Sequence, residues 1–306
     1  MCPAMLMLRL KVFVSLFCFA YPSARGFAQA PTSPESRPLP ELNAFLDRIK
    51  DNLKSDRLLL CQYTYNMKSS TRYLDKQGRV KKIENREYEV YPSLDEDMAY
   101  ERLISKDGRL LDAAELDEQD RKYKKKADAR ARKLAGERKN EQEDRLAKEA
   151  EESRKERETI EDLLKLYEFT LLRREMIDSH SAIWIEFTPK SQYRPQTKDG
   201  RILKKLRGRA LVSDSDYQII RVDVELSEDL SFGLGLLARM HKGATLRFMR
   251  RKINNEIWLP AEFEIIGSAR VLLLKQLRVE STSFFSEYKK YSVSSTYELM
   301  TEKPSR

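Results

Sequence analysis

Alternation of apolar and polar residues with a period of two, broken only by short turns, is the feature that most limits how this chain can fold. The alternation begins at Leu58, stops near Leu111, and returns after Thr159 until close to the C-terminal end. A period of two indicates β-strands with one buried face. Strands joined by short turns must be antiparallel, because a parallel neighbour needs a crossover of a dozen or more residues. The sequence therefore predicts an antiparallel meander.

The number of strands predicts the shape of the sheet. Three strands precede residue 112, with turn signals KQGR at 76–79 and KDGR at 106–109. About eight strands follow residue 160, one of them LSFGLGLLARM at 230–240. A sheet of about eleven strands is expected to curl or to close on itself. We therefore expect a mainly β (α+β) fold in which the strands form an unclosed β-barrel.

One amphipathic helix is expected before the first strand. In LPELNAFLDRIKDNLKSD, at residues 39–56, apolar side chains recur at helical spacing over 40–54, and Pro40 suits the first turn. Such an apolar stripe needs a surface to pack on, so we expect the helix to lie on the concave face of the sheet. The stripe consists of Leu42, Phe45, Leu46, Ile49 and Leu53.

A highly charged segment separates the two blocks of strands. Residues 115–158 contain 15 Lys or Arg and 14 Asp or Glu, and no Pro. Acids stand four residues before bases, as in Glu118 with Lys122, and each such pair stabilises a helix by about 0.2–0.5 kcal/mol. Apolar residues are too few for a coiled-coil seam. Two interpretations stay open, a solvated and partly frayed helical insertion, or a spacer or docking arm for an envelope protein partner.

The first residues resemble a secretory signal peptide. Arg9 and Lys11 precede an apolar run at 12–20, and a small-residue cleavage site ends at Ala28. The run is short for a bilayer span, so a retained anchor is the less favoured alternative. Cleavage would lower the net charge from +9 to +6 and leave Cys61 as the single cysteine. We expect a periplasmic protein that does not bind nucleic acid.

The predicted organisation follows from these segments. It comprises a signal peptide (1–28), a linker (29–37), the N-terminal helix with the first strands (38–112), the charged helical insertion (113–159), the remaining strands (160–290) and a C-terminal tail (291–306).

One stretch, ARVLLLKQLRV at 269–279, is expected to form a strand whose two faces are both apolar for about two pleats, because Val271, Leu272, Leu273 and Leu274 run together. Its second face would need a cover of protein, membrane or a bound apolar molecule, because soluble proteins avoid large exposed apolar patches. A cavity for an acyl chain is the favoured interpretation, and a core closed by loops and by the charged insertion is the alternative. The predicted cavity lining is Phe232, Leu234, Phe248, Phe263, Ile265, Leu273 and Leu277.

Motifs of catalysis are lacking in the sequence. His180 and His241 fall in predicted turns, and Cys61 lies in the apolar strand LLLCQY, which favours an inert thiol. Neither a nucleophile elbow, a zinc-ligand pattern nor a phosphate-binding loop occurs. Asp214 and Asp216 belong to a turn, where Asp is expected for local hydrogen bonding. We expect no catalytic residue, no metal and no cofactor, and a carboxylate-based hydrolase is the least favoured function.

A basic cluster stands out in RPQTKDGRILKKLRGR, at residues 194–209. Such a cluster could attract the anionic headgroups of a membrane surface, or it could be a solvated loop with a positive bias. The residues predicted for a membrane surface are Arg201, Lys204, Lys205, Arg207 and Arg209.

An amphipathic N-terminal helix, followed by a long antiparallel meander with LPAEFEIIG near its end, resembles the bacterial lipoprotein-localisation (LolA/LolB-like) superfamily, which includes outer-membrane lipoprotein-sorting proteins. The resemblance covers residues 38–112 and 160–290 and rests on the order of the elements. It implies an unclosed β-barrel whose concave side holds acyl chains, with no enzymatic activity. The charged insertion departs from that pattern.

We therefore expect a non-enzymatic carrier or receptor for lipid or for the acyl chains of an acylated protein. The alternative is a structural or scaffold protein of the cell envelope, which has a closed core and docks a partner through residues 115–158.

Overall fold

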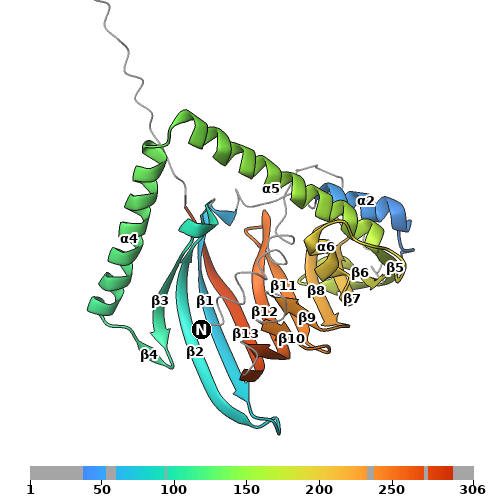
Figure 1. Cartoon of the computed structure of the whole chain (residues 1–306). Helices are drawn as coiled ribbons and strands as arrows, with labels where there is room; N and C mark the ends of the chain where they lie inside the picture. The colour runs from blue at the N-terminus through green and yellow to red at the C-terminus, as the bar shows by residue number, and fades with distance from the viewer. Residues whose placement is uncertain (1–36, 53–59, 94, 233–237, 272–274, 292–306) are drawn as a thin grey trace, which may run out of the picture.

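The strands of the protein form one antiparallel sheet that does not close into a barrel (Figure 1). The computed structural model describes residues 37–52, 60–93, 95–232, 238–271 and 275–291. Eleven strands follow one another across the sheet in the order β4-β3-β2-β1-β13-β12-β11-β8-β7-β6-β5, and the short strands β9 and β10 form a hairpin beside β12. The predicted mainly β fold is confirmed. The strands are β1 (Tyr63–Leu74), β2 (Val80–Tyr91), β3 (Tyr100–Lys106), β4 (Arg109–Leu110), β5 (Tyr167–Ile177), β6 (His180–Pro189), β7 (Leu206–Ser213), β8 (Ile219–Leu226), β9 (Leu230–Phe232), β10 (Ala238–Met240), β11 (Thr245–Ile253), β12 (Ile257–Val271) and β13 (Lys275–Lys290).

The strand order places consecutive parts of the chain far apart. Strand β1 pairs with β13, so the first block of strands attaches to the last strand of the second block. Strands β4 and β5, which follow each other in the sequence of strands, lie at the two opposite edges of the sheet. The segment between them must therefore connect one edge of the open sheet to the other.

The helix before the first strand packs on one face of the sheet, as predicted. Phe45 and Ile49 of α2 are 2% and 6% exposed and join an apolar cluster formed by β6, β7 and β8. Burial of these side chains stabilises the fold by about 1.5–3 kcal/mol each. We call the face on which α2 packs the inner face. The helices are α2 (Leu42–Asn52), the 3₁₀ turn η2 (Glu96–Met98), α4 (Ala113–Ala135), α5 (Lys139–Leu166) and α6 (Lys198–Leu203).

The charged insertion forms two helices, α4 and α5, which we call the strap. Asp112 begins α4 with a capping box, since its side chain accepts from Glu115 N at 2.9 Å and its own N donates to the Glu115 carboxylate at 3.0 Å. Helix α4 stands beside β3, and α5 runs from there towards β5 (Figure 1). At 1.5 Å per residue the two helices are about 35 and 42 Å long. Their length matches the task of joining the two edges of the sheet.

The insertion ends later than the sequence predicts. We expected the two-residue alternation to return at residue 160, but α5 continues to Leu166. The last two turns of α5 are helical because they are anchored in the core, with Ile160 and Leu166 buried in two different apolar clusters. Tertiary packing therefore decides the conformation of a stretch whose local pattern is ambiguous.

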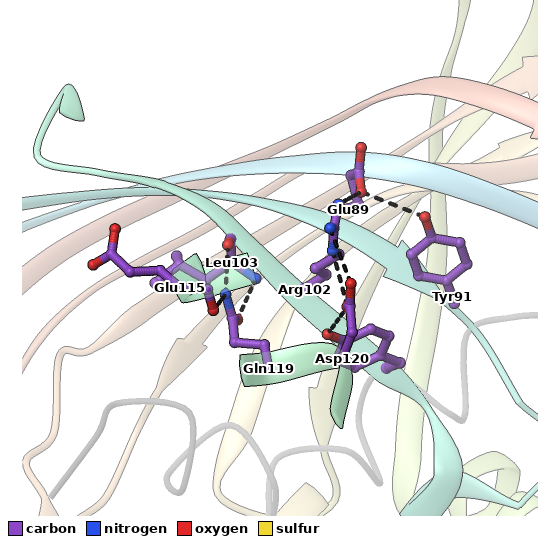
Figure 2. A network of polar contacts seen from close by, with 8 residues as sticks. Glu89, Tyr91, Arg102, Leu103, Glu115, Gln119 and Asp120 are labelled. Atoms are coloured by element: carbon purple, nitrogen blue, oxygen red, sulfur yellow. Dashed lines mark hydrogen bonds and ion pairs between the residues drawn. The ribbon is translucent and has the colours of Figure 1, made fainter. Parts of the chain in front are cut away.

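The two-residue strand β4 pairs with only Ser105 and Lys106 of β3, and helix α4 covers the rest of this edge of β3 with its side chains (Figure 2). The Gln119 side chain accepts from Leu103 N and donates to Leu103 O, both at 3.0 Å. Arg102 contacts Asp120 at 3.0 Å through both Nε and Nη2, and contacts Glu89 at 3.1 Å. A free strand edge is a template for aggregation. The strap therefore protects this edge as well as spanning the sheet.

Two stretches that we expected to be single strands are hairpins. The stretch 269–279 is divided between the end of β12 and the start of β13, with Ala269 opposite Leu277 and Val271 opposite Lys275. Residues 272–274 connect the two strands and lie outside the described residues. The argument from a strand with two apolar faces is therefore wrong. Likewise LSFGLGLLARM is the hairpin of β9 and β10, in which Phe232 lies opposite Ala238.

Candidate functional site

Two rows of side chains cross the inner face of the sheet and define the candidate site. Residues directly opposite each other in antiparallel strands point to the same face, so the inner face can be followed from Val222 and Val224, which cluster with Phe45, in both directions. From β5 to β2, the first row is Leu171, Ile185, Ala210, Val222, Phe248, Phe263, Ser283, Ser69 and Arg86, and the second is Phe169, Phe187, Gly208, Val224, Leu246, Ile265, Ser281, Thr71 and Glu84.

The rows change from apolar to polar in the middle of the sheet. Apart from Gly208, they are apolar from β5 to β12. They carry only hydroxyl side chains on β13 and β1, and they end on charged side chains on β2. A molecule lying across the strands would therefore meet an apolar surface, then neutral hydroxyls, then charges.

The apolar part extends beyond the surface that α2 covers. Phe248 and Phe263 lie opposite each other across β11 and β12, and both are buried. Leu246 packs against the α2 cluster and Ile265 beside it is half-buried. Farther along the inner face, Leu277 lies opposite Ala269 and is also half-buried. The apolar surface thus continues from the α2 cluster along β12.

Four hydroxyl side chains form what we call the hydroxyl seam between β13 and β1. Thr71 Oγ1 and Ser281 Oγ are 2.8 Å apart, and Ser283 Oγ donates to Ser69 Oγ at 3.2 Å. Thr71, Ser281 and Ser283 are buried. The seam is polar but uncharged. Because the hydroxyls hydrogen-bond to one another, each of them has a hydrogen-bond partner although most of the seam is buried.

The charged end of the rows is organised around Glu84. Its carboxylate accepts from Lys82 Nζ at 2.6 Å and Arg86 Nη2 at 3.2 Å, and the Tyr73 hydroxyl donates to it at 3.5 Å. The hydrogen bond from Lys82 holds the pKa of Glu84 below its ordinary value, against the opposing effect of burial. Glu84 is therefore ionised at neutral pH, and this end of the inner face carries fixed charges.

The predicted lining residues fall partly on this face. Phe248, Phe263, Ile265 and Leu277 all lie on the inner face, and the first two are in direct cross-strand register. Phe232 belongs to β9 in the short hairpin beside β12. Leu234 and Leu273 lie outside the described residues.

Sequence reasoning missed the polar half of the face. We expected a continuous apolar concave face, but the hydroxyl seam interrupts it at β13. The seam depends on the pairing of β1 with β13, and Thr71 and Ser281 are 210 positions apart in the chain. The available signal was a pair of hydroxyl residues two positions apart in each strand, in KSSTRY and in ESTSFF.

The predicted basic cluster is dispersed over α6 and the outer face of β7. Arg207 pairs with Glu225 at 3.0 Å, and Arg209 pairs with Asp223 at 3.1 Å. Main-chain carbonyls accept from the other three side chains, namely those of Arg201, Lys204 and Lys205. Contact with a membrane surface stays a prediction.

His180 begins β6 in the hairpin of β5 and β6, whereas His241 lies in the turn between β10 and β11, which do not pair with each other. His180 Nδ1 lies 2.7 Å from Asp178 O, and His241 Nδ1 lies 3.4 Å from Asp229 Oδ2. In the part of the chain that the structure describes, no three His, Cys, Asp or Glu side chains gather where they could hold a metal ion. None of the described helices combines the length and the apolar composition needed to cross a bilayer.

Comparisons with solved structures find remote likenesses. Similar structures include a DUF1329 family protein from Desulfovibrio piger (12% identity, 83% of this chain, 94% of the other, TM-score 0.26). A domain from Vibrio parahaemolyticus described as an outer membrane lipoprotein-sorting protein is 10% identical over 77% of this chain and 87% of its own, with a TM-score of 0.26. A LolA-superfamily protein from Nitrosomonas europaea is 11% identical over 82% of this chain and 94% of its own, with a TM-score of 0.25.

Two of these three proteins carry the lipoprotein-sorting or LolA description that the sequence resembles. No protein-family model and no curated protein matches the chain. At these TM-scores the likeness contributes no argument about binding, which has to come from the inner face itself.

Proposed function

We propose that the inner face of this half-barrel binds an amphiphilic lipid or the acyl chains of a lipid-modified protein, and that the protein is a non-enzymatic periplasmic carrier or receptor. The observation that carries the proposal is the apolar surface of β11 and β12, which extends past the α2 cluster and borders a polar seam. Phe248 and Phe263 are buried, so a ligand would meet the apolar rows at the half-buried Ile265 and Leu277 and displace what covers the two phenylalanines.

Burial of an acyl chain supplies the affinity. Each buried methylene contributes about 0.8 kcal/mol, so a chain of several methylenes on the apolar rows offsets the cost of ordering the ligand. No proton transfer or covalent step is needed. The chemistry of the face is therefore that of a binding site, in which shape and polarity select the ligand.

Two neighbouring isoleucines of β12 provide the test. Ile265 lies on the inner face opposite Leu246, whereas Ile266 lies on the outer face opposite Thr245 and is 41% exposed. Ile265→Asn places an amide on the apolar surface, and we expect the affinity for a fluorescent fatty acid to fall about tenfold, which corresponds to about 1.4 kcal/mol. Ile266→Asn makes the same chemical change on the opposite face and should leave the affinity within twofold.

The measurement is a fluorescence titration of both variants, with circular dichroism as the check of folding. Equal affinities for the two folded variants, whether both unchanged or both reduced, would contradict binding on the inner face.

A further inference from the structure

The charged end of the inner face has an excess of positive charge. Arg86 lies opposite Lys106 of β3, so Lys106 joins Lys82 and Arg86 on this face, beside the single carboxylate of Glu84. Asp107 follows in the adjacent turn and also acts on Lys82 and Glu84. With both acids counted against the three bases, the charged end has a net charge of +1. An anionic group is therefore favoured there over a neutral or cationic one.

The basic side chains are within reach of a ligand. The Lys82 side chain is 61% exposed and that of Arg86 is 25% exposed. Glu84 holds both of them close to the hydroxyl seam through its ion pairs at 2.6 and 3.2 Å. The carboxylate thus orients two cations beside the neutral part of the face. Lysine and arginine are the residues that bind phosphate groups most often, arginine through paired hydrogen bonds and lysine as a point charge.

The order of surfaces across the strands matches the order of groups in one class of amphiphile. Neighbouring strands lie about 4.8 Å apart, so the hydroxyl seam starts about 5 Å from the apolar residues of β12, and the cations of β2 lie about 14 Å from them. A glycerophospholipid presents acyl chains, then ester groups that accept hydrogen bonds, then an anionic phosphate. The half-buried Ser69 accepts from Ser283 within the seam, so its own hydroxyl proton is left to donate to an ester, and Lys82 and Arg86 are suitable partners of the phosphate.

We propose that the charged end of the inner face recognises the phosphate headgroup of an anionic glycerophospholipid, whose acyl chains lie on β11 and β12 and whose ester groups lie over the hydroxyl seam. This inference rests on the proposed function and names the ligand class of the same face.

The test compares headgroups at constant acyl chains. Dioleoylphosphatidylglycerol, dioleoylphosphatidylcholine and dioleoylglycerol each compete with a fluorescent fatty acid for the whole exported chain, residues 29–306. We expect the anionic lipid to bind more tightly than the other two, by a factor on the order of ten. The double variant Lys82→Gln, Arg86→Gln should lose this preference and keep its affinity for dioleoylglycerol.

A matched control removes two cations from the opposite face of the neighbouring strand. Lys68 and Arg72 of β1 point to the outer face, and each pairs with one carboxylate, Glu87 at 3.2 Å and Glu280 at 2.7 Å. The variant Lys68→Gln, Arg72→Gln therefore makes the same change in net charge and should keep the wild-type preference. Arg86→Lys keeps the positive charge and should retain most of the preference for the anionic lipid. Circular dichroism checks that each variant is folded.

The outcomes separate the two proposals. Equal binding of all three lipids by the wild type overturns the headgroup site and leaves the proposed function standing, whereas failure of all three to bind overturns both. Loss of the preference in both double variants would show a non-local charge effect and overturn the assigned site. Displacement of the probe by glycerol 3-phosphate without acyl chains would indicate a site for soluble phosphate esters, and would equally overturn the lipid assignment.

Discussion

Asp162 shows how one buried carboxylate fixes the segment that follows β6. It lies near the end of α5, is 4% exposed, and accepts from the Tyr193 hydroxyl at 2.6 Å and from the backbone N of Gln196 and Thr197 at 3.0 Å. Gly200 approaches so closely that a Cβ there would lie 2.8 Å from Asp162 Oδ2. The buried charge is thus satisfied by several donors, as buried charges must be.

The protonation of Asp162 should control part of the stability at low pH. Burial raises the pKa of Asp162, but the hydrogen bonds from Tyr193, Thr197 and Gln196 outweigh it, so the pKa lies below the ordinary value in the folded state. Stability from this group is therefore fully present above the unfolded-state pKa of about 3.9, and is lost as the pH falls through the lower folded-state pKa. We expect Asp162→Asn to lower the free energy of unfolding by about 2–3 kcal/mol at pH 7.

Urea unfolding between pH 7 and pH 2 measures the effect. The difference in free energy of unfolding between the wild type and Asp162→Asn should shrink below pH 4. The control Asp144→Asn, at an exposed position of the same helix, should have the wild-type free energy of unfolding at every pH. If the free energies of unfolding of the wild type and of Asp162→Asn differed by the same amount at every pH, this role of Asp162 would be contradicted.

At the scale of residues, the alternation along the strands predicts which face a side chain takes, but the sequence does not predict the buried polar contacts. The period of two assigns Ile265 and Ile266 to opposite faces, and the cross-strand pairs do the same. Asp162 could not be recognised, because its partners lie more than 30 positions away, in a loop without any motif. A local pattern shows which face a side chain takes, but not which group it meets there.

At the scale of elements, the turn signals and the amphipathic helix were predictable because their causes are local. Gly78 and Gly108 adopt positive φ values of 82° and 83° in the turns where the sequence placed them. Helix α2 follows from its apolar spacing. The separation of β9 from β10 and of β12 from β13 was not predicted, because residues 233–237 and 272–274 continue the apolar pattern and, apart from Gly233 and Gly235, contain no turn residue.

The contact of α4 with the edge of the sheet gives a prediction at this scale. Gln119→Ala removes two hydrogen bonds to the backbone of Leu103, so we expect the free energy of unfolding to fall by about 1–2 kcal/mol and the open edge of β3 to promote self-association. Urea unfolding and sedimentation velocity measure the two effects. Gln142→Ala, at an exposed position of α5, is the control. A Gln119→Ala protein that is monomeric and as stable as the control would show that the edge needs no such cap.

At the scale of the whole molecule, the pairing of β1 with β13 determines most of the architecture. It brings together strands that are separated by almost the whole described chain, and it places β4 and β5 at opposite edges. The strap then has to run from one edge of the sheet to the other, which accounts for its length and for its two anchored ends (Figure 1). None of this could be predicted from local patterns, because long-range pairing leaves no signature in a single sequence.

The same pairing creates the feature on which the proposed function depends. Without it, the two rows would end on Ser281 and Ser283 of β13. With it, they border the hydroxyl seam and the cations of β2 on one continuous face. The inner face is amphiphilic across the strands, which is why we propose an amphiphilic ligand for it.

The most direct measurement is native mass spectrometry of the protein, purified gently after expression of the full chain, followed by organic extraction and identification of the lipids. We expect one lipid or acylated species bound per chain, lost from the Ile265→Asn variant and retained by Ile266→Asn. A wild-type chain that carries no such species and takes up no fluorescent fatty acid would contradict the claim that the inner face is a binding site.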